Sequence, residues 1–419
     1  MNTRRPVVYD ISRLATRFLN DTPNGIDRID LILAKHFLHR SDGSVYPLLC
    51  TVAGPSIVPV QLVHEVIEEL DLRWWREAKS AYVDAIYERV VTRILGQGTG
   101  RISAAPRSRA LASFRSIMRY SLRPGRSPAR TAPPGSVYIN ASTFPLEYEW
   151  YLNWLRKRRD VKSAFFIHDL LPIECPQYFW KSEPDRYRKR LDNIRSVGGA
   201  AIVSRDCVAA QLKAFTKAQR YAPAICQAVP PISDIFRTTR RTDPRVTNSR
   251  YFLACGTIEP RKNHVLLLDL WRELVDRLGP SAPKLVIAGK RGWNNEETIG
   301  RLQRSRASPY VIEVAGLSTP SLKRLMDGAT ALLAPSFAEG FGLPVAEALA
   351  AGLPVVASNI EPFREFNNSL LQLIDPLDGL GWLQAIQQIT RDPAPAIAAT
   401  PDPGAETFTR KIDDFLERL

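Results

Sequence analysis

The sequence has no hydrophobic run long enough for a membrane span, and it has few cysteines. Its longest stretch without a charged residue, Gly43 to His64, is interrupted by three prolines, whereas a spanning helix needs ~20 mostly apolar residues. The residues before Asp10 contain no apolar core of the kind that a secretory signal needs. The five cysteines are scattered through the 419 residues, and none has C-x-x-C spacing. We therefore expect a reducing, cytoplasmic environment, without a disulfide framework or a zinc knuckle.

Acidic residues are missing from one long stretch of the chain. Residues 89–146 contain ten arginines and no Asp or Glu, and residues 1–249 carry 39 basic and 23 acidic side chains. Residues 250–395, by contrast, are neutral, with 15 side chains of each sign. This uneven charge indicates two domains that face different partners. The partner of the basic domain should be anionic: a membrane surface, a phospholipid-like substrate or nucleic acid.

Short apolar runs alternate with amphipathic stretches along the whole chain, which predicts an α/β fold with parallel sheets. A polar stretch from Pro230 to Asn248 is expected to join two domains, residues 1–235 and 249–392, and a Pro/Ala linker leads to a final helix at 404–419. One long helix is expected over Val63–Leu95. The expected strands are Val7–Ser12, Val45–Val52, Ser136–Ala141, Lys162–Ile167, Ala200–Ser204, Tyr251–Cys255, Lys284–Ala288, Val311–Val314, Ala331–Ala334 and Val355–Ala357.

The most informative segment is Phe337–Ser358, with the sequence FAEGFGLPVAEALAAGLPVVAS. Gly340 and Gly342 lie in a loop between an expected strand and an expected helix. Glycines let the backbone approach a ligand closely, and a helix start offers unpaired N–H groups, so the segment favours a phosphate or pyrophosphate. Glu339 and Glu347, eight residues apart, are suited to accept hydrogen bonds from sugar hydroxyls on either side of that anion. The alternative is that both are solvated acids near a helix start, where the helix dipole favours them.

The motif E-G-F-G-L-P, a second Glu eight residues after the first, and A-x-A-A-G-x-P-V-V-A-S together resemble the signature of retaining glycosyltransferases of family 4 (group 1 glycosyl transferases). The resemblance extends to GTIEPRKNH (Gly256–His264), LVIAGKRGW (Leu285–Trp293) and VAGL (Val314–Leu317). In the first half, NGIDR (Asn24–Arg28) is similar to the glycine loop of this family, and FIHDL (Phe166–Leu170) to its His-Asp strand end. The resemblance implies a GT-B fold, in which two Rossmann-like, doubly wound domains face each other across a cleft and the last helix crosses back to the first domain.

The resemblance also implies a role for each matching residue. Glu339 would contact hydroxyls of the donor sugar, Glu347 would bind the ribose of the nucleotide, and His168 would donate a hydrogen bond to the donor sugar. Lys262 and Arg261 would neutralise the diphosphate leaving group, whose charge grows in the transition state. The other donor-binding positions lie in the matching loops and are Gly25, Gly256, Thr257, Gly289, Gly340, Phe341, Gly342 and Leu343.

Several of these residues also have a simpler explanation. Arg261 and Lys262 could form a solvated turn after a strand, and His168 could be a structural residue at a strand end. No D-x-D motif is present, and with two fixed cations at the leaving group we expect that neither a metal nor another cofactor takes part. The remaining histidines lack metal-ligand spacing and are interpreted as structural or exposed; they are His36, His39, His64 and His264.

The activity that the resemblance implies is transfer of a sugar, with retention, from a nucleotide sugar to a saccharide or lipid-diphosphate-linked saccharide in surface polysaccharide assembly. The E-P-R-K-N form of the first loop favours GDP-mannose or a deoxysugar nucleotide as the donor. Two alternatives stay open. A GT-B epimerase would act on the nucleotide sugar without an acceptor, and a basic nucleic-acid-binding protein would also account for the arginines, although no nucleic-acid motif is recognised.

Residues 97–135 form the only segment of unusual composition, and its centre predicts a basic amphipathic helix over Arg109–Arg123. One face of this helix is apolar and another is cationic; the two sets are Leu111, Phe114, Met118 and Leu122, and Arg115, Arg119 and Arg123. Such a helix could pack on the first domain with its basic face in solvent. It could instead lie on an anionic bilayer, which predicts a peripheral protein on the inner face of the cytoplasmic membrane.

Overall fold

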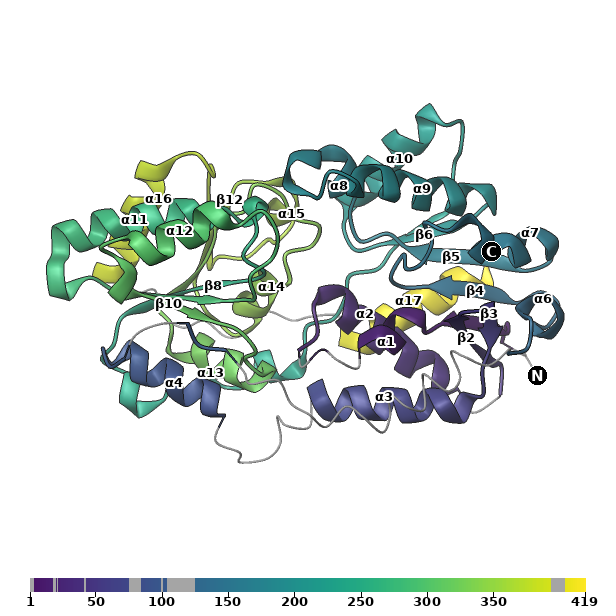
Figure 1. The fold of residues 1–419 in the computed structure, drawn as a ribbon, viewed down its shortest axis with the longest axis horizontal. Helices are drawn as coiled ribbons and strands as arrows, with labels where there is room; N and C mark the ends of the chain where they lie inside the picture. The colour runs from purple at the N-terminus through teal and green to yellow at the C-terminus, as the bar shows by residue number, and fades with distance from the viewer. Residues whose placement is uncertain are drawn as a thin grey trace.

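The computed structural model describes residues 4–17, 20, 22–40, 43–74, 84–98, 101–103, 125–392 and 404–419. Over these residues the strands form two sheets, one in each half of the molecule (Figure 1). The first sheet contains β1 Val7–Asp10, β2 Val45–Thr51, β3 Gly54–Ile57, β4 Val137–Asn140, β5 Lys162–Phe166, β6 Ala200–Val203 and β7 Ile225–Gln227. The second contains β8 Tyr251–Cys255, β9 Lys284–Ala288, β10 Val311–Val314, β11 Ala331–Ala334, β12 Val355–Ser358 and β13 Leu371–Ile374.

Both sheets are parallel, apart from one edge strand. The order of the first is β3-β2-β1-β4-β5-β6-β7, in which only β3 runs antiparallel, and the order of the second is β10-β9-β8-β11-β12-β13. Central strands such as β1 and β8 are buried on both faces because helices cover both faces of a parallel sheet. The expected α/β fold with two parallel sheets is therefore confirmed. In each half the strand order reverses beside the first strand, and ligands of open α/β sheets bind at the carboxyl end of such a switch point.

Helices cover both faces of each sheet. Those in the half of the first sheet are α1 Ser12–Thr16, α2 Gly25–Leu38, α3 Val60–Trp74, α6 Pro128–Thr131, α7 Asn153–Lys157, α8 Leu171–Glu174, α9 Glu183–Ser196, α10 Asp206–Ala218 and α17 Gly404–Glu417. Those in the half of the second are α4 Ala85–Ile94, α11 His264–Leu278, α12 Glu296–Arg304, α13 Thr319–Gly328, α14 Leu343–Ala350, α15 Glu361–Arg364 and α16 Gly379–Arg391.

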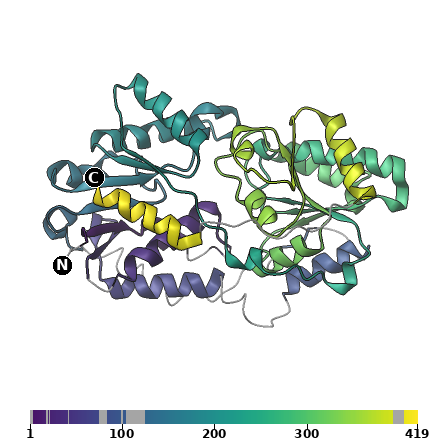
Figure 2. The same cartoon turned by 180° about the vertical axis from the view of Figure 1, so that it is seen from behind.

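Two helices pack on the half that is distant from them in sequence. The last helix, α17, lies beside the first sheet (Figure 2), where Phe408 and Ile412 join the core formed with α2 and α3. Its Glu417 carboxylate accepts a hydrogen bond from the backbone N–H of Arg5, 3.0 Å away. In the opposite direction, α4 packs against β10, and its Tyr87 lies in the core of the second sheet. The two halves are thus tied together by exchanged helices.

The position of α4 corrects one expectation from the sequence. A single helix over Val63–Leu95 is wrong, because Asp84 has an extended backbone and caps the start of α4, which packs on the other sheet. Asp84 starts α4 by accepting a hydrogen bond from the backbone N–H of Ile86. Residues that the sequence assigns to the first domain therefore contribute to the core of the second.

The predicted basic helix over Arg109–Arg123 lies outside the described residues. Among the helices that the structure does describe, none combines the length and the apolar character needed to cross a bilayer.

Candidate active site

The predicted donor-binding residues of the second half lie in loops that follow neighbouring strands. Lys262 ends a short 3₁₀ helix, Pro260–Lys262, in the connection after β8, and Glu339 lies in the loop between β11 and α14. Because β8 and β11 are adjacent and parallel, their carboxyl ends meet at one edge of the sheet. Lys262, Glu339 and Gly342 line one pocket at this edge, together with His264 and Cys255.

A compact ion-pair cluster surrounds Glu339. The Nη1 atom of Arg261 donates to one carboxylate oxygen at 2.9 Å, and Lys262 and the hydroxyl of Ser336 donate to the other. Burial by itself would raise the pKa of Glu339, but the neighbouring Lys262 and Arg261 outweigh it and lower that pKa to about 2. Glu339 is therefore ionised at neutral pH and fixed in position.

The same cluster contains an acid that the sequence analysis missed. Glu259 is buried and accepts from Arg261 at 2.7 Å. Two cations and two carboxylates are thus packed together, and Arg261 bridges both carboxylates. Only the position of Glu259, two residues before Arg261 in the matching loop, could have indicated it.

The glycines allow close backbone approach at this edge. Gly342 has φ +82°, a left-handed conformation that favours glycine, and it precedes the first residue of α14, Leu343. A Cβ atom at Gly289 would overlap the carbonyl oxygen of Gly256, so the loops after β8 and β9 touch through their backbones. Thr257 follows Gly256 in the first of these loops.

Phe341 is held by a cation from the other half of the molecule. The guanidinium of Arg205, the residue before α10, lies 4.3 Å from the centre of the Phe341 ring, and its Nη2 atom is 3.4 Å from the Phe341 carbonyl oxygen. Arg205 was not predicted as a site residue. Its partners lie more than a hundred residues away in sequence, so no local pattern points to it.

Glu347 contacts the first half of the molecule directly. It lies on α14, and its carboxylate forms an ion pair with Arg28, from the first turn of α2. Gly25, at the start of α2, lies so close to α14 that an added Cβ would be 2.8 Å from Cδ1 of Leu343. The starts of α2 and α14 therefore meet across the two halves. Gly340 and Asp169 form a second such contact, because a Cβ atom added to Gly340 would be 2.9 Å from the Cβ of Asp169.

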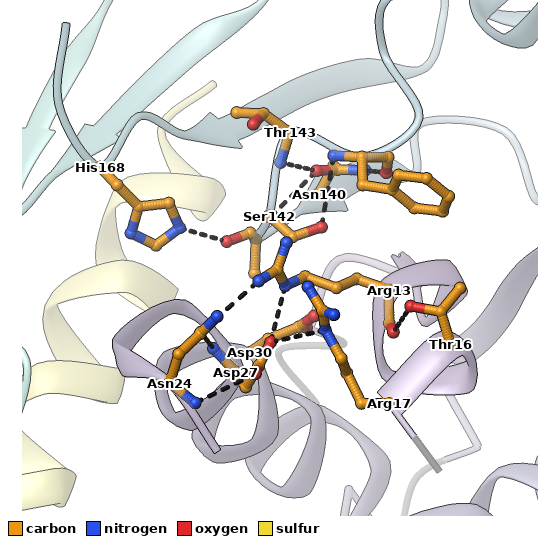
Figure 3. A network of polar contacts seen from close by, with 12 residues as sticks. Arg13, Thr16, Arg17, Asn24, Asp27, Asp30, Asn140, Ser142, Thr143 and His168 are labelled. Atoms are coloured by element: carbon orange, nitrogen blue, oxygen red, sulfur yellow. Dashed lines mark hydrogen bonds and ion pairs between the residues drawn. The ribbon is translucent and has the colours of Figure 1, made fainter. Parts of the chain in front are cut away.

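His168 follows β5 at the carboxyl edge of the first sheet. Its Nε2 atom is 2.8 Å from the carbonyl oxygen of Ala141 (Figure 3). A carbonyl only accepts, so Nε2 carries the proton. Burial lowers the pKa of His168 to about 4, against the opposing effect of this hydrogen bond. The ring is then neutral, and its unprotonated Nδ1 is able to accept a hydrogen bond. The sequence analysis expected His168 to donate a hydrogen bond to the donor sugar, and its contact with the sugar stays a prediction.

A polar network adjoins His168 on the same edge (Figure 3). Asp27 accepts from Arg13 at 2.8 Å and from Arg17 at 3.0 Å, and it forms a capping box with Asn24 at the start of α2. Asp27 is thus shared by two arginines, and Asp30 also interacts electrostatically with Arg13. Neither arginine was predicted to belong to the site.

Of the other histidines and the cysteines, His264 and Cys255 line the pocket with Lys262 and Glu339. Burial lowers the pKa of His264 to about 3, and His36 contacts Asp413 of α17 at 2.9 Å. All five cysteines are free thiols. Within the described ranges, no group of three or more His, Cys, Asp or Glu side chains is arranged to hold a metal ion.

Comparison with known proteins relates this site to one family. Residues 236–395 match the family model described as glycosyl transferases group 1. O-antigen chain mannosyltransferase B of Escherichia coli is 34% identical over 128 residues, which cover 30% of this chain and 33% of the relative. The serotype-specific mannosyltransferase WbdA of Escherichia coli is 27% identical over 222 residues, 48% of this chain and 26% of the relative. The chain thus spans a third or less of the length of these relatives.

The fold is similar to that of HepE from Anabaena, whose crystal structure was determined in complex with UDP. The TM-score is 0.60 at 13% identity, and the similarity covers 99% of this chain and 100% of HepE. At this identity the similarity establishes the fold alone.

Proposed function

Because residues 236–395 match the glycosyl transferases group 1 family and the chain has the GT-B fold, we propose that it transfers a sugar from a nucleoside-diphosphate donor to a saccharide acceptor with retention of configuration. The observation that carries this proposal is the ionised Glu339, held by Lys262 and Arg261 beside the glycine loop and the start of α14. Cations, anion-binding backbone and an acceptor of sugar hydroxyls meet there, and a nucleotide sugar needs all three.

The two halves have separate tasks in this proposal. Residues 249–392 bind the donor. Glu347 binds the ribose, the loops around Gly256 and Gly342 bind the diphosphate, and Glu339 contacts the sugar. Residues 1–235 bind the acceptor and close over the donor with His168 and the Gly25 loop. The contacts between the starts of α2 and α14 support such closure, because they bring both halves to the same place.

The chemistry follows from the fixed charges. The hydroxyl oxygen of the acceptor attacks the anomeric carbon on the side from which the diphosphate leaves, which preserves the configuration. The bond from that carbon to the diphosphate oxygen breaks, and the departing oxygen takes the proton of the acceptor hydroxyl. Lys262 and Arg261 stabilise the charge that develops on the leaving group, and preorganised cations contribute most at that moment. These cations fill the role that a metal has in other transferases, so the reaction should not require one.

Donor and acceptor classes are inferred from the relatives and the charge. The relatives described above are named mannosyltransferases, one of them of O-antigen chains, which supports GDP-mannose or a deoxysugar nucleotide as donor and surface polysaccharide assembly as the process. The excess of arginine in residues 1–249 supports an acceptor linked to a lipid diphosphate.

A thermal-shift screen against GDP-, UDP- and dTDP-linked sugars tests the proposal, because a ligand that binds only the folded protein raises its melting temperature. We expect one class to raise it, without added metal and in the presence of EDTA. No shift with any nucleotide sugar would refute the proposal. Isomerisation of the donor in the absence of any acceptor would instead identify an epimerase.

The membrane location rests on the basic segment of the sequence. We propose that the protein is peripheral on the inner face of the cytoplasmic membrane, with the arginines of residues 97–135 on anionic lipid, where each contributes about 1 kcal/mol. Co-sedimentation with vesicles of anionic lipid should fall when Arg115, Arg119 and Arg123 are replaced by Ser, and also at high salt. Binding that neither change affects would exclude this segment as the membrane contact.

A further inference from the structure

Arg28 lies where the two halves of the molecule meet. It is in the first turn of α2, and its guanidinium reaches across to the carboxylate of Glu347 on α14. Both side chains are mostly covered, with exposed fractions of 17% for Arg28 and 4% for Glu347. Among the described residues, Arg28 is the one cation paired with Glu347.

This ion pair compensates the buried charge of Glu347. Burial raises the pKa of Glu347, because a carboxylate removed from water loses its hydration, and the nearby Arg28 opposes that shift. An uncompensated buried charge costs several kcal/mol. A ligand that binds Glu347 must therefore replace the hydrogen bonds that Arg28 supplies.

The same carboxylate has a second partner in the proposed function, the ribose of the nucleotide. With only 4% of the Glu347 side chain exposed, the two ribose hydroxyls reach it only when Arg28 moves aside. The two hydroxyls then donate to the carboxylate in place of the guanidinium.

The displaced guanidinium would lie near the place proposed for the diphosphate. Arg28 is three residues, less than one helical turn, from Gly25, and Gly25 lies against Leu343, the first residue of α14. The start of α14 is the place proposed for the diphosphate. Arginine binds phosphate groups through two parallel hydrogen bonds, so the diphosphate offers Arg28 a replacement for Glu347.

We propose that Arg28 is a nucleotide-responsive switch between the two halves: it holds Glu347 until the ribose of a nucleoside diphosphate takes the carboxylate, and it then binds the diphosphate of the same ligand. This inference rests on the proposed function and adds a nucleotide-binding residue to it. Only a ligand that carries both a ribose and phosphates satisfies both groups, so the switch selects nucleoside diphosphates over nucleosides.

Calorimetric titration of the full chain with GDP, UDP, guanosine and uridine separates the two parts of the switch. In Arg28→Ala the nucleoside meets no competitor for Glu347, so its Kd should fall several-fold. The nucleoside diphosphate loses a charge-assisted contact, so its Kd should rise by about tenfold or more. A residue with only a structural role would not change the two affinities in opposite directions.

Lys35→Ala serves as the matched control, because Lys35 is a cation of the same helix that pairs with Asp71, away from α14. Its affinities should equal those of the wild type. Arg28→Gln keeps most of the side-chain volume and should repeat the pattern of Arg28→Ala if the smaller residue fails to fold.

Three outcomes would overturn the inference. In the first, the affinities of Arg28→Gln for the nucleoside and for the nucleoside diphosphate both weaken. In the second, both stay as in the wild type. In the third, Lys35→Ala changes the two affinities as much as the Arg28 variants do. If the wild-type protein binds neither GDP nor UDP, the proposed function itself is refuted. This result is distinguishable from failure of the switch, because it is obtained without any variant.

Discussion

Removal of the charge at Lys262 should affect stability and activity in different ways. Lys262 and Arg261 both pair with the buried Glu339, so Lys262→Met leaves this carboxylate with fewer compensating groups. Breaking a buried ion pair from one side costs about 3–5 kcal/mol. Because Arg261 and Ser336 still donate to Glu339, we expect a loss near the lower end, about 3 kcal/mol. Turnover should fall by about 10²–10³-fold, as for loss of one group that stabilises the transition state.

The double variant Lys262→Met/Glu339→Gln distinguishes the two effects. Replacing both members of a buried pair is often neutral for stability, so the stability lost in each single variant should largely return, and a double-mutant cycle should give a coupling energy of about 1–3 kcal/mol. Activity should not return, because neither the cation nor the carboxylate is present. Urea unfolding and donor turnover measure the two quantities. Additive losses of stability, or recovery of turnover in the double variant, would refute this reasoning.

Three further predictions concern single positions. Because burial lowers the pKa of His168 to about 4, the ring stays neutral, and the pH profile of kcat/KM should show no step from this residue between about pH 5 and 8; a step that His168→Gln abolishes would contradict this. Gly25→Ala should weaken donor binding a few-fold, because its Cβ would be 2.8 Å from Cδ1 of Leu343 and the flexible leucine side chain keeps the overpacking cost at the lower end of its range, about 1 kcal/mol; Leu343→Ala should relieve the effect, and unchanged binding would refute it. Burial raises the pKa of Asp30 from 3.8 to about 7, so its contribution to stability is present below the lower value and is lost as the pH rises through the upper one. Urea unfolding at pH 5 and 8 should therefore show a smaller pH dependence for Asp30→Asn, and an equal or larger dependence would contradict the shift.

Strands that are buried on both faces were predictable from the sequence. The apolar runs of β8 to β11 match the structure in both bounds, because helices on both faces of a sheet impose such runs. The prediction missed β3, β7 and β13. β3 begins with Gly-Pro and is an antiparallel edge strand, whereas β7 has three residues and β13 is only half-buried, so none produces a clear pattern.

The split between α3 and α4 was not predictable from periodicity. The helical spacing of apolar residues indicates which face of a helix is buried, but it does not indicate which sheet the helix packs on. Tyr87 and Val90 of α4 enter the core of the second sheet, and no local feature of the sequence distinguishes this core from the first.

The candidate site was predictable where the motif itself carries it. Glu339, Lys262 and Arg261 meet as the motifs indicated, because they follow adjacent strands of one sheet. Arg28 and Arg205 were missed, because their partners, Glu347 and the ring of Phe341, lie far away in sequence and belong to the other half. Contacts of this kind depend on how the two halves meet, which no local pattern records.

The most direct test of the central claim is proton NMR of the reaction with GDP-mannose, or with the nucleotide sugar that stabilises the protein most in the thermal-shift screen. The reaction is followed with EDTA present and with water or a saccharide as acceptor. The account predicts release of the nucleoside diphosphate together with a product whose anomeric configuration equals that of the donor, and loss of both in Lys262→Met. An inverted product, or no turnover of any nucleotide sugar in the screen, would contradict it.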